Sequence, residues 1–239
     1  MSAPVIRAAI PAASIRSRVP DSVVVLTATL LVLAFHAIRG FPTLSDVGGD
    51  NDSAMRLVQV RDFLAGQGWF DVMQYRMGAE GGFPMHLSRL VDLPIATLIA
   101  ASRTVTGDAM LAETMALILW PLSLFAVSLY LILKAARALG GELAVLPASI
   151  VGGLALIFLN IFAPGALDHH NVQLTLALAT LLFLIRIRNI TASAALAGAS
   201  AAGMLAIGME TAPYVAVSGG VVALLFLFGD HRDARLAGQ

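Results

Sequence analysis

The sequence predicts an all-α, polytopic membrane helix bundle with about six transmembrane helices and a long first extracytoplasmic loop. Of its 239 residues, 58% are hydrophobic and only 13% are charged, about half the charged share of an average soluble domain. The mean hydropathy is +0.84. The apolar residues gather in uncharged runs long enough to cross a bilayer, and clusters of Arg and Lys separate alternate runs.

Six uncharged windows define the expected transmembrane helices, since a spanning helix needs about 20 residues and about 17 to 25 are tolerated. These helices are predicted over residues 22–39, 114–133, 143–163, 171–187, 190–209 and 211–229. The fourth window is short, but Arg186 and Arg188 at its end can extend their charged groups to the interface. Residues 93–102 are too few to span and are expected to form an interfacial or re-entrant helix.

The basic residues predict the orientation. Cytoplasmic loops are enriched in Lys and Arg, and this rule is met when both termini are cytoplasmic. The short inner connections then carry Arg7, Arg16 and Arg18, Lys134 and Arg137, Arg186 and Arg188, and Arg232 and Arg235. We therefore expect a multi-pass protein of the inner (cytoplasmic) membrane.

The outer, periplasmic face then receives the loop of residues 40–113 and the turns near Asp168 and Glu210. Within the loop, the stretch DSAMRLVQVRDFLAGQGW places Met55, Val58, Phe63 and Leu64 near helical spacing and stops at glycine. This pattern is typical of an amphipathic helix that lies on the membrane surface.

Two polar segments of this outer face contain most of the candidate functional residues. The segment GGDNDSAMRLVQVRDF has Asp50 and Asp52, which are either helix caps or loop carboxylates, or carboxylates for metal binding and catalysis. The segment APGALDHHNVQ has Asp168, His169 and His170. One carboxylate and two imidazoles in a tight turn suit Mn²⁺ or a tolerant Mg²⁺ site, although Asp168 also qualifies as a cap for the following helix.

Further candidates lie near the ends of apolar runs. Glu210, in IGMETAPY, is either an exposed turn carboxylate or a catalytic residue, because a carboxylate so close to an apolar span is costly. In FPMHLSRLVDLP, His86 and Arg89 either bind phosphate or take part in a surface ion pair with Asp92. His36 lies inside the first window and is expected to pack there or face lipid headgroups.

Several functions are excluded or gain no support. The chain has no cysteine and a formal net charge of zero, so disulfides and thiolate chemistry are excluded and no basic surface indicates nucleic acid. It has no phosphate-binding loop for nucleotides and no nucleophile elbow for serine hydrolysis.

The arrangement of these segments resembles the GT-C superfamily of membrane glycosyltransferases, closest to the oligosaccharyltransferase catalytic subunits of bacteria and archaea. That family has an Asp followed six residues later by Arg in its first outer loop, as Asp50 and Arg56 are spaced here. Its second motif takes the form D-x-H within DHH, which Asp168 and His170 match. Residues 48–187 carry the resemblance. It implies that Asp50, Asp168 and His170 hold a divalent cation, with Asp52 competing for the first role.

The resemblance also implies a function. Family members have about twice as many spans and a soluble C-terminal domain, so residues 1–239 are expected to be one transmembrane domain of a larger module. The expected reaction is metal-dependent glycosyl or oligosaccharyl transfer from a polyprenyl-phosphate-linked donor to a protein or glycan acceptor at the outer face, with the chain seated among membrane lipids. The alternative is a non-catalytic membrane subunit or a transporter-like protein.

Roles can then be assigned to individual residues. Asp50 or Asp52 would orient or deprotonate the acceptor, with Glu210 as a further catalytic candidate. Arg56, Arg76, His86 and Arg89 are the expected substrate-binding residues.

Overall fold

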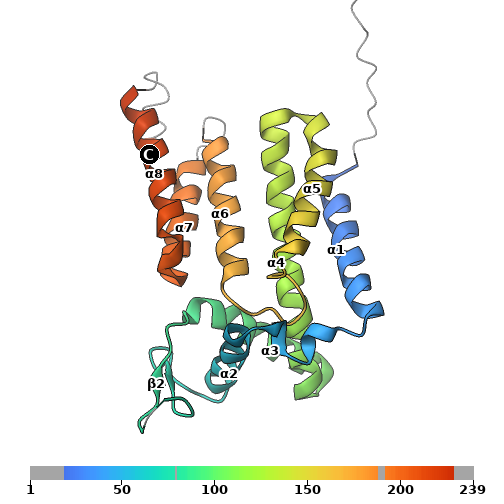
Figure 1. Ribbon diagram of the computed structural model, residues 1–239, viewed down its shortest axis with the longest axis vertical. Coiled ribbons are helices and arrows are strands. Elements are labelled where there is room, and N and C mark those ends of the chain that lie inside the picture. The colour runs from blue at the N-terminus through green and yellow to red at the C-terminus, as the bar shows by residue number, and fades with distance from the viewer. Residues whose placement is uncertain (1–18, 79, 188–191, 229–239) are drawn as a thin grey trace, which may run out of the picture.

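The computed structural model describes residues 19–78, 80–187 and 192–228 (Figure 1). Its helices are α1 (Asp21–Ile38), α2 (Asn51–Leu64), α3 (Arg89–Thr106), α4 (Ala109–Gly140), α5 (Val145–Phe158), α6 (His170–Ile185), α7 (Ser193–Ile207) and α8 (Ala212–Phe228). Short 3-10 turns are η1 (Pro42–Leu44), η2 (Val47–Gly49), η3 (Glu142–Ala144) and η4 (Met209–Thr211). Strands β1 (Met73–Gln74) and β2 (Phe83–Pro84) pair antiparallel.

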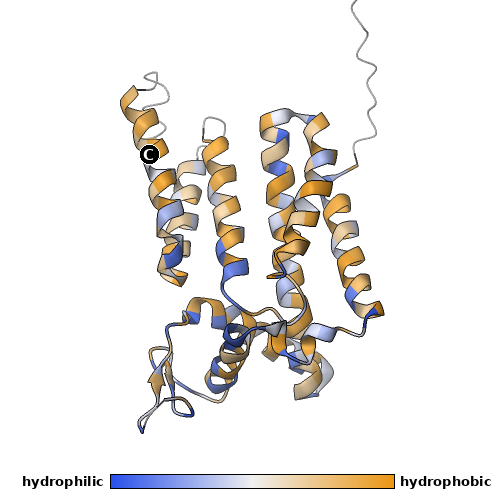
Figure 2. Ribbon diagram, viewed as in Figure 1, coloured by the Kyte–Doolittle hydropathy of each residue, from blue (hydrophilic) through white to orange (hydrophobic). Residues whose placement is uncertain are grey.

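The all-α prediction is confirmed, and the apolar helices stand out in the hydropathy view (Figure 2). Within the described ranges, three helical segments are long and apolar enough to cross a membrane: Asp21–Ile38, Ala109–Gly140 and Met209–Phe228. Shorter apolar helices cover Glu142–Phe158, His170–Ile185 and Ser193–Ile207. A helix therefore lies in every predicted window, while three of the six have the full length of a span.

Helix α4 is the central element of the bundle. Its 32 residues pack against α1 and α5 on one side and α6 on the other (Figure 1). The α1–α4–α5 core is apolar, with Val25, Val32, Leu122, Phe125, Leu129, Leu133, Leu156 and Phe162 buried. At one end Asp21 bonds Lys134 at 3.0 Å and also Arg137, which ties the start of α1 to the end of α4.

Helices α2 and α3 and the β1–β2 hairpin form a small module at the opposite end of α4 (Figure 1). We call this the α2–α3 end of the bundle. Helix α3 packs against both α2 and the first turns of α4. Their shared core consists of Leu57, Val60, Val91, Ile95, Ala96, Ile99, Ala116, Leu117 and Leu167. The module thus has an apolar interior of its own that fixes it to the bundle.

The helix predicted over this stretch is present as α2, and its position on the membrane surface stays a prediction. Met55, Val58 and Phe63 are only half-buried and Leu64 is exposed, whereas the face packed on α3 includes Arg56 and other polar residues. Polar side chains can be buried here because each meets a partner on α3. The apolar periodicity of the sequence could not indicate that polar side chains of α2 are buried against α3.

Helix α3 is longer than the expected interfacial segment 93–102. Its first turn begins after Ser88, whose hydroxyl accepts a hydrogen bond from the Leu90 N–H at 3.3 Å, so the helix incorporates the charged residues Arg89 and Asp92. The predicted basic clusters at 7–18 and 232–235, Arg188 and the adjoining ends of predicted helices lie outside the described residues.

Candidate metal centre

The two polar segments singled out in the sequence meet at the α2–α3 end, where two glycines approach closely. A Cβ on Gly48 would lie 2.9 Å from the Gly165 carbonyl oxygen, and one on Gly165 would lie 2.7 Å from the Gly48 nitrogen. Both glycines have positive φ, +81° and +95°, where other residues are strained. Beside them Thr43 Oγ1 donates to the Pro164 carbonyl at 2.5 Å. The contact brings the start of α2 against the loop before α6.

The Ser53 hydroxyl joins the two segments. It donates to Asp50 Oδ2 at 2.8 Å and accepts from the backbone N–H groups of Leu167 and Asp168 at 3.0 and 3.1 Å. Asp50 in turn caps α2, accepting from the Ser53 N–H at 2.6 Å. Ser53 is completely buried. This one hydroxyl therefore links the cap of α2 to the backbone that carries Asp168.

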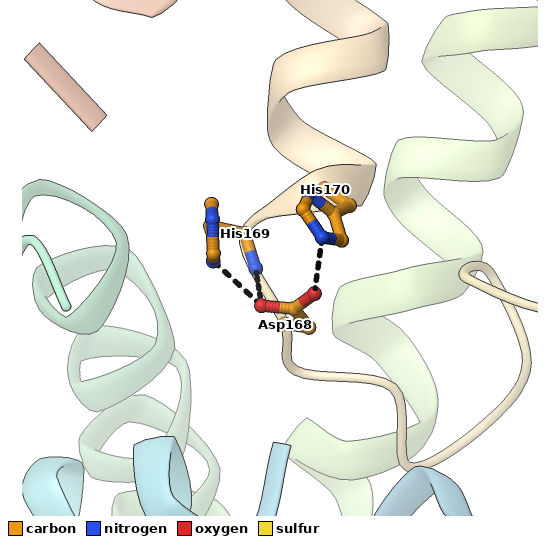
Figure 3. Close-up of side chains that lie close together, drawn as sticks. All are labelled: Asp168, His169 and His170. Carbon is orange, nitrogen blue, oxygen red and sulfur yellow. Dashed lines mark hydrogen bonds and ion pairs between the residues drawn. The ribbon is translucent and has the colours of Figure 1, made fainter. Parts of the chain in front are cut away.

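Asp168, His169 and His170 form a cluster at the first turn of α6 (Figure 3). Their ligand atoms all lie within 4.8 Å of one another. His169 Nδ1 is 2.6 Å from Asp168 Oδ1, and His170 Nε2 is 3.4 Å from Asp168 Oδ2. Asp168 and His169 are largely buried, whereas about half of the His170 side chain is exposed. The cluster is thus buried at Asp168 and His169 and open to the surroundings at His170.

The donor set of this cluster fits a divalent cation. His169 Nδ1 is buried and has no hydrogen bond of acceptable geometry, although Asp168 Oδ1 is close. Buried polar atoms are usually bonded, so such an atom calls for an explanation. One carboxylate with two imidazoles suits Mn²⁺ or a tolerant Mg²⁺ site. The cluster of Asp168, His169 and His170 could hold such an ion. Asp50 is not one of these three residues, and its carboxylate accepts hydrogen bonds from Ser53.

Charge pairing sets the ionisation of the cluster. Burial alone would raise the pKa of Asp168, but the neighbouring imidazoles of His169 and His170 outweigh it and hold that pKa below its ordinary value. Burial likewise lowers the pKa of His169, but the carboxylates of Asp168 and Glu210 outweigh it and raise that pKa above its ordinary value. Without a cation, the cluster is therefore an imidazolium–carboxylate pair in mildly acidic solution.

Glu210 reaches the cluster from η4. Its Oε1 lies 2.5 Å from His169 Nε2 and accepts from Gln173 Nε2 at 2.7 Å. Gln173 Oε1 also lies 3.2 Å from His170 Nδ1. His169 thus stands between two carboxylates, and Gln173 links Glu210 to His170.

A pocket of about 340 Å³ opens beside His169. It is lined by His86, Leu87, His169, Leu205, Ile207, Gly208, Met209 and Glu210. The pocket brings together residues from three separate parts of the chain and offers polar groups next to apolar walls, which is typical of ligand sites.

The basic residues expected to bind substrate divide into two kinds. Arg56 is fully buried and bonds Asp92 Oδ1 at 2.8 Å. Arg89 is also buried and donates to Asp92 at 3.3 Å, to Gln67 at 2.8 Å and to the Asp71 carbonyl at 2.6 Å. Asp92, which one of the two sequence alternatives placed in a surface ion pair, is completely buried instead. These two arginines hold α2, α3 and the loop between them together.

Arg76 and His86 are accessible, in contrast. Arg76 pairs with Asp62 at 2.9 Å, and its side chain is 67% exposed. His86 is exposed and lines the pocket beside His169. Asp52 is half-buried in the first turn of α2. A substrate can reach these three side chains without any change in the core.

Three residues of the site were not assigned roles from the sequence: Ser53, Gln59 and Gln173. Spacing carried a signal for two of them. Ser53 follows Asp50 by three residues, the separation at which a cap bonds the helix, and Gln173 follows its partner His170 by three, a spacing at which helical side chains meet. Gln59, which donates to Asp92 at 2.5 Å, gave no such signal because its partner is 33 residues away.

The chain matches no protein-family model, and no curated protein or solved structure is similar enough to it to count as a match.

Proposed function

We propose that the chain is a membrane-embedded, divalent-cation-dependent transferase that moves a glycosyl or oligosaccharyl group from a polyprenyl-phosphate-linked donor to an acceptor at the outer membrane face. The observation that carries this proposal is the Asp168–His169–His170 cluster, seated at the end of an apolar bundle and beside a pocket. The six-span topology with both termini cytoplasmic is part of the proposal. It gains support from the apolar helix found in every predicted window.

Asp168, His169 and His170 would hold the cation, with Asp50 supporting them through Ser53. The cation would neutralise negative charge that develops on the phosphate leaving group. The chain's own residues position the substrates. Glu210, bonded to Gln173 and open to the pocket, is the carboxylate best placed to orient or deprotonate an acceptor hydroxyl or amide.

Donor binding is assigned to the accessible basic groups. His86 lies on the pocket wall, and Arg76 stands on the hairpin that flanks α2. The apolar helices would keep a lipid-linked donor in the bilayer beside the site, so that both substrates meet at the interface at high effective concentration.

Metal binding is the first test. Purified protein in detergent is titrated with Mn²⁺ and the free ion is measured by electron paramagnetic resonance. We expect one ion per chain and loss of binding in the Asp168→Ala, His170→Ala double variant. Asp46→Asn, which alters an exposed carboxylate of the same outer loop, serves as the control and should bind as the unaltered chain does. If the double variant binds Mn²⁺ equally well, the proposed site is wrong.

Transfer is tested separately in proteoliposomes that contain a polyprenyl-diphosphate donor with a labelled sugar. We expect label transfer that needs Mn²⁺ or Mg²⁺ and that falls at least about a hundredfold in Glu210→Gln, since general acid–base groups typically contribute about 10² to 10⁴ in rate. Metal binding without any transfer would support a non-catalytic membrane subunit instead.

A further inference from the structure

An apolar groove lies between α1, α4 and α5. In Figure 1, α1 and α5 stand on the other side of α4 from α6, whose first turn carries the Asp168–His169–His170 cluster. The volume of the groove is about 430 Å³. The residues that matter for its shape and chemistry are Ala28, Val32, Phe35, His36, Phe125 and Gly153. From Ala28 to His36 the groove follows α1 for roughly 12 Å at 1.5 Å rise per residue. It therefore has the length and surface to accept part of a hydrocarbon chain.

Glycine keeps this groove open. A Cβ on Gly153 would meet no atom within 4 Å, whereas one on the adjacent Gly152 would lie 2.9 Å from Ile132. Gly152 is thus required for helix packing, but Gly153 is not, and a larger side chain there would enter the groove. Protein interiors leave few such voids unfilled, so the space beside Gly153 is suited to a separate molecule.

The end of the groove nearest the α2–α3 end carries positive charge. The Arg39 guanidinium lies 5.1 Å from the centre of the Phe35 ring, which lines the groove. His36 is next to it, and its Nδ1 is buried without a hydrogen-bond partner. Among the described residues, neither side chain takes part in an ion pair. The Arg39 charge and the unbonded Nδ1 of His36, both at one end of an apolar groove, are complementary to an anionic head on a hydrocarbon tail.

We propose that this groove binds one anionic glycerophospholipid, with an acyl chain against Gly153 and the phosphate at Arg39 and His36. A bilayer phospholipid suits the position better than the polyprenyl donor. A head group held at Arg39 lies across α4 from the Asp168 cluster, whereas the donor phosphate would have to reach that cluster. The inference needs the membrane placement of the chain but not its transferase activity.

The test is native mass spectrometry of the purified full chain with added dioleoylphosphatidylglycerol or dioleoylphosphatidylcholine. We expect one tightly held phosphatidylglycerol per chain. Gly153→Leu should weaken it at least about tenfold, because several buried methylene groups lose their place. Gly220→Leu is the matched control: Gly220 also has open space around its Cβ position but lies on α8, away from the groove. It should leave binding unchanged.

The head-group contact is tested with Arg39→Gln. Because a basic residue near the membrane surface adds a modest attraction for anionic lipid, the preference for phosphatidylglycerol over phosphatidylcholine should fall about fivefold. Arg103→Gln, an exposed arginine at the end of α3, should keep it. If Gly153→Leu fails to fold, Gly153→Ala and Arg39→Gln take its place, and phosphatidylglycerol binding is again measured by native mass spectrometry.

Three results would overturn the proposal. Gly153→Leu could bind phosphatidylglycerol as tightly as the unaltered chain does. The unaltered chain could bind both phospholipids equally, as an ordinary lipid-facing surface would. Polyprenyl phosphate could displace phosphatidylglycerol at equal concentration, which would identify an isoprenoid as the occupant.

Discussion

The buried charges of the α2–α3 end show how single residues determine this part of the molecule. Asp92 accepts hydrogen bonds from Arg56, Gln59 and Arg89, and all four side chains are buried. Arg56 has two further donors, Nε and Nη2, that are buried without partners. A network of this kind is costly to disturb, because a buried charge that loses its partner is left without solvation.

We predict that Asp92→Asn lowers the free energy of unfolding by about 3 to 5 kcal/mol, because it leaves two buried guanidinium groups without their counter-charge. Unfolding by SDS in mixed micelles measures the effect. Asp62→Asn is the matched control, since the partly exposed Asp62–Arg76 pair should contribute no more than about 1 kcal/mol and the amide oxygen can still accept from Gln74. Equal losses in the two variants would contradict the assigned role of Asp92.

The Asp168–His169 pair predicts a pH dependence for the metal-free protein. The raised pKa of His169 contributes stability that is complete below its unfolded value of 6.5 and is lost as pH rises through the folded value. The lowered pKa of Asp168 contributes stability above 3.8 that is lost as pH falls through its folded value. Stability from the pair should therefore be greatest between about pH 3.8 and 6.5.

Thermal unfolding in detergent with a chelator, followed across the acid and neutral range, measures this dependence. His169→Gln should remove the part of the decline that occurs above pH 6.5. The assignment fails if the variant and the unaltered chain lose stability in parallel there.

At the scale of elements, the glycine contact between η2 and the loop before α6 decides whether the two polar segments meet. We predict that Gly48→Ala costs about 1 to 3 kcal/mol more than Gly49→Ala, because its methyl group would overlap the Gly165 carbonyl. Gly49 is a close control: its φ is +76°, so both substitutions strain the backbone, but a Cβ there meets nothing within 4 Å.

The two variants should also differ in Mn²⁺ affinity, since only Gly48→Ala displaces the backbone next to Asp168. Both stability and metal titration can be measured on the same preparations. If Gly48→Ala and Gly49→Ala lose equal stability and equal Mn²⁺ affinity, backbone strain alone accounts for the losses. The contact between η2 and the loop before α6 would then contribute nothing to them.

The sequence predicted the helices well and the contacts between them only in part. Long apolar windows identify α1, α4 and α8 because their signal is local. The pairing of Asp168 with its neighbours could also be anticipated, since the three residues are adjacent. The burial of Asp92 and the link through Ser53 could not, because each depends on partners more than thirty residues away. Long-range packing of this kind leaves no periodic trace in a single sequence.

For the whole molecule, the lack of cysteine offers a direct measure of topology. Phe70→Cys and Leu143→Cys each introduce one thiol at a position that is more than nine-tenths exposed. Phe70 lies between α2 and β1, at the α2–α3 end, and Leu143 lies in η3, which follows the other end of α4. We predict that a membrane-impermeant maleimide labels Phe70→Cys from the periplasm. Leu143→Cys should be labelled only after the inner membrane is opened. Labelling of both from one side would contradict the proposed orientation.

The length of α4 has a consequence for where the cluster stands relative to the bilayer. Its 32 residues extend about 48 Å, at 1.5 Å per residue, while the hydrocarbon core is only about 30 Å thick. Near the start of α4, Ala116 and Leu117 belong to the core that it shares with α3. In a membrane, the length of α4 therefore sets the height above the hydrocarbon core at which the Asp168–His169–His170 cluster and its pocket meet molecules arriving from the lipid and from the water.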